Sequence, residues 1–598
     1  MSRPLVRWLA LNGLIHAALL AALGAHGRPM EWAWLLAWPL MGWLFWEPFV
    51  LSPLAERPRT LAAFAVLWGL WLCFATGYRF YQGTYPDHGT VEFACSEPRY
   101  GWLLFKDRLS FGMALAFAVS AAAAVFALKG LRPAHIRGRW WKLITAALAL
   151  AALNRFVPAT TVQPPDTALL MLATQVRARR MGAGGLRRAL AREKAPQGPP
   201  PPFQVLLLVH ESLNADAFDP VLMPKLAARI QSGEVAAFSE AFAPAPMTDV
   251  ALPSLFSGVD PVQGSARYHH EPLLWHRAQA HGMGTALFSV QRFDYYGFPD
   301  YLLADGLDRY ETQDLAGPPL RSNAGAPPLV NDAAADDGAL IPWLRAWLDA
   351  EKGKPALTIL HFGATHAPYF QKAGFTPFSA ADVARARPEV PLTRRADLAR
   401  YWNAIRYLDQ VQEEALQEYA RRGLLEHTLV ISTSDHGENF HGPAQGRLDD
   451  VRPQTLHVPL WISLPKGFPV AMVDAMKANT GRLVSNLDIA PTLAEALGDP
   501  LPPDVQRLGS SLLAPLPQDR ILLAHNGGEI RRRDPAALSL LWMEDGRLRE
   551  WRWHGQEGAF AAVVRPGDGE ESLNLEPGEK ARITKVLAAF PFLHEVRP

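Results

Sequence analysis

The chain is 598 residues long, too long for a single hydrophobic core, so at least two domains are expected. Its 59 basic and 58 acidic side chains leave a net charge of +1, which gives no electrostatic reason to expect nucleic-acid binding. The two cysteines, Cys73 and Cys95, lie in an apolar run and in a polar loop. We therefore expect no bridge between them and no disulfide framework in the C-terminal part of the chain.

Residues 1–158 predict a transmembrane domain of about five helices. Their apolar runs have about the length that a bilayer core requires. The runs lie at about 6–26, 31–50, 61–78, 109–128 and 141–157. Because the first run is followed by others, it is expected to anchor the chain rather than to be removed as a signal peptide.

Basic side chains gather in the loops on one side of these runs. They are Arg3, Arg7, Arg57, Arg59, Lys129, Arg132, Arg137, Arg139 and Lys142. The positive-inside rule makes that side cytoplasmic, and an odd number of spans then places the rest of the chain outside the cytoplasm. Residues 159–202 predict a basic juxtamembrane helix, lying on an anionic leaflet or simply solvated, followed by a proline-rich linker.

Residues 203–598 alternate short apolar strands with amphipathic helices, which predicts an α/β domain with a mostly parallel sheet between helices. We expect strands at about 204–209, 284–290, 358–361, 429–434 and 458–463, and helices at about 339–351, 398–421 and 488–497. Stretches rich in Pro, Ala and Gly, at about 313–338 and 373–396, predict long surface loops. The segment 520–598 predicts a small antiparallel subdomain.

Three of the apolar strands end in side chains that can bind a metal ion. These side chains are Glu211 after the first strand, His361 and His366 at the second, and Asp435 and His436 after the third. Ligands of open α/β sheets bind at the carboxyl ends of the strands, and carboxylates and imidazoles hold divalent cations. Gly437 is interpreted as the flexible position that lets two adjacent side chains face one ion.

Thr248 is the candidate nucleophile. It stands before an apolar, helix-like segment that contains Pro253. A threonine hydroxyl bound to a metal ion becomes more acidic and can attack phosphorus in line. A helix N-terminus behind it would favour the negative charge that develops. The alternative is that Thr248 only caps the helix.

Together these motifs resemble the alkaline phosphatase and sulfatase superfamily. Within it, the chain is most similar to the membrane-anchored phosphoethanolamine transferases that modify bacterial outer-membrane glycolipids. The resemblance covers nearly the whole chain and rests on five motifs in the same order. They are Glu211 in His-Glu-Ser-Leu-Asn-Ala-Asp, Thr248 five residues before Pro253, His361-Phe-Gly-Ala-Thr-His366-Ala-Pro-Tyr, Asp435-His436-Gly-Glu-Asn and Gln454-Thr-Leu-His457-Val-Pro.

The resemblance implies zinc, or Mn²⁺ or another divalent cation, held by Glu211, Thr248, Asp435 and His436. It implies that phosphoethanolamine moves from phosphatidylethanolamine through phospho-Thr248 to a glycolipid or glycan, such as lipid A or the lipopolysaccharide core. The enzyme would be a multi-pass protein of the bacterial inner membrane, among membrane lipids, with a periplasmic catalytic domain.

The resemblance also implies roles for further polar side chains. His366 and His457 would bind the phosphoryl group. Apart from the resemblance, Glu438, His441 and His361 are candidates for positions beside the metal ion or behind its ligands. For His361 we favour a strand-end residue whose ring is satisfied by a backbone hydrogen bond.

The sequence also departs from that family. The usual Gly-Glu-Thr is replaced by His210-Glu211-Ser212, and the cysteines that commonly bracket the nucleophile are absent. The transferred group therefore stays open. A phosphoglycerol transferase and a phosphodiesterase or sulfatase-like hydrolase of the same superfamily are alternatives, and a non-catalytic membrane scaffold is a further one.

Formylglycine chemistry is not expected. True sulfatases carry Cys or Ser two residues before a proline and an arginine two residues after it. Here Ala251 precedes Pro253, and Leu255 takes the place of the arginine.

Overall fold

The structure is a computed structural model of the chain, and its described residues begin at 200 and end at 588. Within that range the description omits residues 261–270, 292, 294–297, 299–301, 303–305, 313–335, 441–449, 502–508, 528–536, 555–557 and 565–569. The five predicted spans, most of the linker and most of the predicted loop 313–338 lie outside the described residues and stay predictions. Within the described part of the chain, no helix combines the length and the apolar character needed to cross a membrane.

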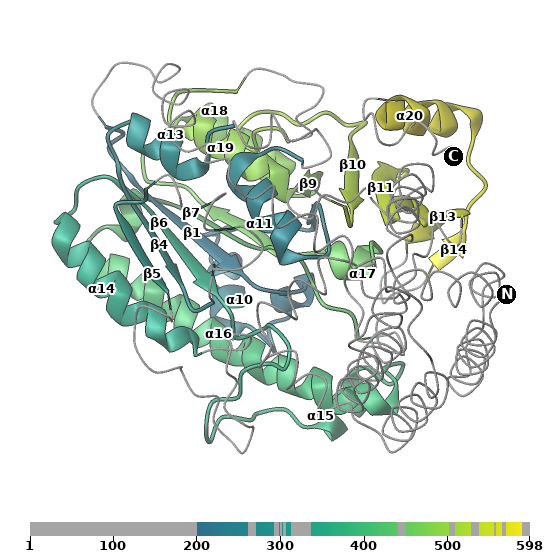
Figure 1. Cartoon of the computed structure of the whole chain (residues 1–598), viewed down its shortest axis with the longest axis horizontal. Coiled ribbons are helices and arrows are strands. Elements are labelled where there is room, and N and C mark those ends of the chain that lie inside the picture. Colours follow the sequence, from purple (N-terminus) through teal and green to yellow (C-terminus); the bar gives the residue numbers. More distant parts are fainter. Residues whose placement is uncertain are drawn as a thin grey trace, which may run out of the picture. The chain divides into compact units, whose positions relative to one another are not determined.

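A seven-stranded sheet forms the centre of the described domain (Figure 1). Its strands are β1 (Gln204–His210), β2 (Ala236–Phe238), β4 (Gly284–Ser289), β5 (Arg309–Thr312), β6 (Ala356–Phe362), β7 (Thr428–Ser434) and β8 (Leu460–Ser463). They lie in the order β2-β8-β7-β1-β6-β4-β5, and the five strands from β7 to β5 are parallel. Only β8 runs against its neighbours β7 and β2. The predicted mostly parallel sheet is therefore confirmed.

Helices cover both faces of this sheet (Figure 1). One face carries α10 (Pro224–Gln231), α14 (Leu340–Glu351) and α16 (Arg395–Arg421), and the other carries α11 (Thr248–Ser257), α13 (Leu274–Ala280), α18 (Val470–Asn479) and α19 (Ile489–Ala496). In β1, Leu206 and Leu208 pack into the first layer, while Val205, Leu207 and Val209 pack into the second. Because both faces are buried, β1 has an unbroken apolar sequence.

The predicted strands and helices are present, but one predicted loop is wrong in part. Each predicted strand end lies within two residues of the observed one, and α16 begins three residues earlier than expected. The segment 373–396 contains a helix, α15 (Ala380–Ala386). Ser379 and Asp382 form its capping box, a start signal that the Pro, Ala and Gly content of the segment concealed.

A second sheet of five antiparallel strands confirms the predicted C-terminal subdomain. Its members are β10 (Ile521–His525), β11 (Ala537–Glu544), β12 (Arg547–His554), β13 (Gly558–Val564) and β14 (Glu570–Ser572). The charged strand β12 was not predicted. On one face of the sheet, Trp542 and Trp551 pack with Ile583 of α20 (Pro577–Ala588), and on the other Leu541 packs with Phe242 of the core.

Short elements complete the domain. They are the two-stranded sheet of β3 (Glu240–Phe242) and β9 (Leu483–Ser485), the helix α17 (Pro453–Leu456), and 3-10 turns at Ala215–Phe218, Asp337–Ala339, Leu392–Arg394, Leu425–His427 and Asn486–Asp488. The strands β3 and β9 join the core to the C-terminal sheet, since Phe242 and Leu483 share a hydrophobic cluster with Leu522 of β10.

Candidate metal centre and active site

The candidate site lies where three adjacent parallel strands end. In the sheet β1 lies between β7 and β6, and His210 pairs in register with Ser434 and Phe362. The first residue after β1 and the first residue after β7 still hydrogen-bond to the neighbouring strand. Glu211 N donates to Phe362 O at 3.1 Å, and Asp435 N donates to His210 O at 2.9 Å. Glu211 and Asp435 therefore leave the sheet at the same edge, where α/β proteins bind ligands.

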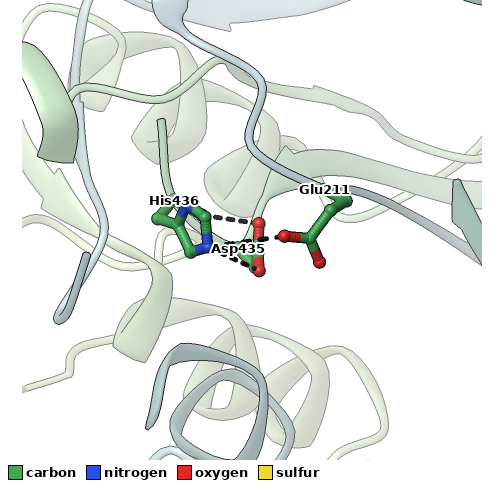
Figure 2. A group of neighbouring side chains, drawn as sticks. All are labelled: Glu211, Asp435 and His436. Atoms are coloured by element: carbon green, nitrogen blue, oxygen red, sulfur yellow. Dashed lines mark hydrogen bonds and ion pairs between the residues drawn. The ribbon is translucent and has the colours of Figure 1, made fainter. Parts of the chain in front are cut away.

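Figure 2 shows the side chains of Glu211, Asp435 and His436 turned toward one another. One ligand atom from each lies within 4.8 Å of the others, and all three residues are fully buried. His436 Nε2 is 3.5 Å from Glu211 Oε1 and 3.3 Å from Asp435 Oδ2. Two buried carboxylates at this spacing repel each other, and a divalent cation would offset that repulsion. Two carboxylates and an imidazole are a ligand set that suits zinc.

The proton on His436 is placed so that the ring can serve as a ligand. Its Nδ1 lies 2.8 Å from Gly437 O. Because a carbonyl oxygen only accepts, Nδ1 carries the hydrogen. Nε2 then directs its lone pair into the cluster that Glu211, Asp435 and His436 form. A backbone bond of this kind commonly orients a metal-binding histidine.

The hydroxyl of Thr248 joins the cluster. Its Oγ1 donates to Glu211 Oε1 at 2.9 Å and lies 3.2 Å from His436 Nε2. Thr248 is the first residue of α11, whose N-cap is Met247, and no side chain caps this helix end. The cap alternative therefore does not describe this hydroxyl. The structure brings together the four residues that the sequence proposed as the metal and nucleophile set.

The helix that carries Thr248 is held rigidly. Every residue of α11 is buried. Gly258 ends the helix with φ +71°, and a Cβ there would lie 2.8 Å from the Cβ of Ala490 in α19. The hydroxyl of Ser254 donates to Val250 O, and the hydroxyl of Ser257 donates to Pro253 O, both at 2.7 Å. The buried helix thus fixes the position of the Thr248 hydroxyl.

Three neighbouring residues that the sequence analysis did not single out support the carboxylates. Ser212 donates its hydroxyl to Glu211 Oε1 at 3.0 Å and its amide to Asp435 Oδ1 at 2.9 Å. Thr365 Oγ1 donates to the backbone oxygen of Glu211 at 2.6 Å. Asn486 Nδ2 donates to Ser434 O at 2.7 Å. For Ser212 and Thr365 the available signal was their place inside the motifs.

Gly437 serves a different purpose from the predicted one. Its φ is not in the left-handed region, so backbone freedom does not explain the glycine. A Cβ at this position would overlap Asn214 Oδ1 and lie 2.9 Å from Thr455 O. Gly437 N also donates to Thr455 O at 2.8 Å. The residue after His436 must therefore be small because the chain packs closely there.

His361 faces the cluster from β6. Its Nε2 is 3.8 Å from Glu211 Oε2, and its Nδ1 hydrogen-bonds Ser289 Oγ at 2.9 Å. The predicted backbone hydrogen bond is thus wrong, because the neighbouring strand β4 places a hydroxyl beside the ring. Burial, with a smaller contribution from His210, lowers the pKa of His361 to about 3. The ring is therefore neutral at pH 7.

His366 lies at the edge of the same cluster. Its Nε2 is 4.0 Å from Glu211 Oε1, and its side chain is 17% exposed, whereas Glu211 is fully buried. Asp337 Oδ1 accepts hydrogen bonds from Gly363 N at 2.7 Å and Ala364 N at 3.2 Å, which hold the loop that leads to His366. His366 is therefore partly open to solvent while lying beside a carboxylate that is not.

His457 and Glu438 line a neighbouring pocket instead. His457 Nε2 donates to Ser239 O at 2.8 Å, and its ring stacks on Phe242 at 4.9 Å. The described contacts of His457 do not include the cluster. Glu438 is tied by its backbone to Asn214, whose Nδ2 donates to Glu438 O at 3.0 Å. His441 lies outside the described residues.

Comparison with known proteins agrees with this fold. The sequence model of the sulfatase family matches residues 204–499. The structure of the integral membrane protein lipooligosaccharide phosphoethanolamine transferase A (EptA) from Neisseria meningitidis is similar to the chain with a TM-score of 0.57 and 15% identity, covering 85% of this chain and 98% of that one. YidJ from Bacteroides fragilis, a candidate sulfatase, is similar with a TM-score of 0.51 and 16% identity, covering 67% and 100%. No curated protein sequence matches the chain. At these identities, the structural likeness shows the fold alone.

Proposed function

We propose that this chain, whose residues 204–499 match the sequence model of the sulfatase family, is a metal-dependent transferase that moves phosphoethanolamine from phosphatidylethanolamine to a glycolipid or glycan acceptor, such as lipid A or the lipopolysaccharide core. The observation that carries the proposal is the hydroxyl of Thr248 meeting Glu211, Asp435 and His436 in one buried cluster. The choice of phosphoethanolamine rests on the resemblance of the motifs.

A zinc ion held by Glu211, Asp435 and His436 would supply positive charge that makes the Thr248 hydroxyl more acidic and offsets charge on the phosphoryl oxygens. Glu211 accepts the hydrogen bond of that hydroxyl and orients it. The N-terminus of α11, directly behind Thr248, favours the negative charge that develops.

The reaction has two balanced steps. Thr248 Oγ1 bonds to phosphorus while the bond from phosphorus to the diacylglycerol oxygen breaks, and the released diacylglycerol takes up the proton that the threonine loses. An acceptor hydroxyl then bonds to phosphorus and loses its proton, while the bond from phosphorus to Thr248 Oγ1 breaks and that oxygen takes up a proton. His366, 4.0 Å from Glu211, is suited to bind a phosphoryl oxygen, whereas the same role for His457 rests on the motif resemblance alone.

A carboxylate in the pocket supports a cationic headgroup. Glu240 lines the pocket together with His457. Burial raises the pKa of Glu240 above its ordinary value, and the nearby His457 offsets only part of that rise. A carboxylate in this place would attract the ammonium group of ethanolamine, whereas glycerol offers no charge to it.

The proposed arrangement along the chain follows from the sequence. Residues 1–158 would span the bacterial inner membrane, and residues 203–598 would form a periplasmic catalytic domain. Residues 159–202 would connect the two. A lipid donor stays in the plane of the membrane, so an anchored domain remains close to it.

The test is mass spectrometry of the full-length chain after incubation with phosphatidylethanolamine and zinc. We expect an ethanolamine-phosphate adduct on Thr248 in the wild type and none in Thr248→Ala. Thr480→Ala is the matched control, since that hydroxyl bonds Lys477 O on the surface. Undiminished group transfer by Thr248→Ala would refute the nucleophile.

The same experiment separates the alternatives. A glycerol-phosphate adduct would identify a phosphoglycerol transferase. An adduct that is released only to water, as free phosphoethanolamine, would identify a hydrolase. A wild-type chain that binds lipid but forms no adduct and transfers no group would favour a scaffold.

A further inference from the structure

A pocket of about 680 Å³ lies between the core and the C-terminal sheet. On the core side Asn214, Glu438 and His457 line it. Asn214 comes three residues after Glu211, and Glu438 comes two residues after His436. The pocket therefore begins at the two chain segments that carry the cluster.

The opposite wall is the turn between β11 and β12, where Gly546, Arg547 and Leu548 line the pocket. Asp545 and Gly546 have φ values of +51° and +70°, as a tight Asp-Gly hairpin requires. Leu541 and Leu548 pack with Phe242 and other core residues, so the hairpin is fixed against the core. The C-terminal sheet therefore forms one side of the pocket, and packing against the core holds that side in place.

Arg547 differs from the other arginines of its strand. Arg549 pairs with Glu579 at 2.6 Å, and Arg552 pairs with Glu550 at 3.0 Å. Among the described residues, the exposed guanidinium of Arg547 has no ion-pair or hydrogen-bond partner. A planar guanidinium suits the two-pronged binding of a phosphate or carboxylate group.

Charge is distributed unevenly over the pocket. Glu240 lies on the core side, next to His457, and Arg547 lies on the sheet side. A second arginine that lines the pocket, Arg387, is paired with Asp216 at 3.2 Å and with Glu389 at 2.5 Å, so its charge is largely matched. The pocket therefore offers an acidic group on its core side and, on its sheet side, a cation that has no partner among the described residues.

We propose that Arg547 binds an anionic group, a phosphate or a carboxylate, on the acceptor, so that the C-terminal sheet selects anionic glycans. This rests on the proposed function, because it names the acceptor class of the same site. The donor's ammonium group would occupy the acidic side, which leaves the cationic side for the second substrate.

Binding tests the proposal without turnover. Full-length chain treated with a chelator is titrated with a disaccharide that carries one phosphate and with the same disaccharide lacking it. We expect the wild type to bind the phosphorylated form about tenfold more tightly, and Arg547→Gln to lose this preference. Arg547→Lys should keep part of it, because the charge remains. In the control Arg482→Gln, a half-buried arginine outside the pocket, the preference should be unchanged. A preference that survives in Arg547→Gln would overturn the proposal.

Turnover then separates the two substrates. Arg547→Gln should form the Thr248 adduct at the wild-type rate and raise the KM for the phosphorylated acceptor about tenfold with little change in kcat. Slower adduct formation would show that Arg547 binds the donor's phosphate, against the proposal. If the wild type forms no adduct, the proposed function fails, and the binding titration still decides the role of Arg547.

Discussion

Asp435 shows how single residues prepare the cluster. Its Oδ1 accepts hydrogen bonds from Ser212 N at 2.9 Å and His436 N at 2.8 Å. Ser212 reaches it because its own φ is +59°, a costly conformation for serine. These backbone donors stabilise a buried negative charge and hold the carboxylate still. The Asp435 carboxylate is therefore already oriented before a metal ion binds.

Gly437 gives the first prediction at this scale. Gly437→Ala should lower zinc affinity more than tenfold, because the new methyl group must displace Asn214 or the Thr455 backbone and with them the adjacent His436. Zinc affinity is measured by competition with a chromogenic chelator. The matched control is Gly481→Ala, where a Cβ meets nothing within 4 Å. Equal affinity in both variants would contradict the packing argument.

At the scale of elements, Glu418 joins α14 to α16. Its side chain is only 2% exposed and pairs with Arg345 of α14 at 2.6 Å and with Arg422 at 2.7 Å, and it also contacts Arg421. Burial alone would raise the pKa of Glu418, but the hydrogen bonds from Arg422, Arg345 and Arg421 outweigh it and hold the pKa at about 2. The ionised form therefore stabilises the packing of the two helices.

The second prediction follows from the sign of this shift. A carboxyl whose pKa is depressed by folding stabilises the fold above its ordinary pKa of 4.5, and that stability is lost as the pH falls toward 2. Glu418→Gln should therefore cost about 2 kcal/mol at neutral pH and little near pH 2. The midpoint of thermal unfolding, followed from pH 7 to pH 2, measures this. Glu414→Gln is the control, because Glu414 and Arg345 are each 47% exposed, and it should cost about 0.5 kcal/mol or less. A Glu418→Gln loss that does not shrink with acid would show that charge is not the cause.

At the scale of the whole molecule, the cluster connects distant parts of the chain. It joins β1 and β7 to α11, and Asn486 ties it to the segment that leads into α19. Without a cation, Glu211 and Asp435 are two buried carboxylates close together, which opposes folding. A bound metal should therefore stabilise the whole described domain.

The third prediction tests this coupling. Removing metal with a chelator should lower the unfolding midpoint of the full-length chain, and added zinc should restore it. At a free metal concentration one hundred times Kd, binding contributes about 2.7 kcal/mol. Glu211→Gln should lose most of the response to zinc, whereas Glu414→Gln should keep it. An unfolding midpoint that does not respond to zinc in the wild type would count against a metal at this site.

The sequence by itself determined the central sheet and the edge at which the site lies. Runs such as Gln204–His210 and Thr428–Ser434 are apolar because both faces of a parallel sheet are buried. In parallel strands the carboxyl ends share one edge, so residues directly after them, such as Glu211 and Asp435, must lie near one another. Thr248 was added to these residues because its motif and the other four follow the same order as in the similar family.

Only the tertiary structure decided what packs across from each residue. Thr248 lies 37 residues from Glu211 and 188 from His436, and the reach of its hydroxyl depends on how the buried helix α11 packs. The partner of His361, the tight contact at Gly437 and the approach of Arg547 to the pocket are likewise invisible in the sequence. Hydrophobic periodicity reports that a face is buried, but it does not report which distant segment buries it.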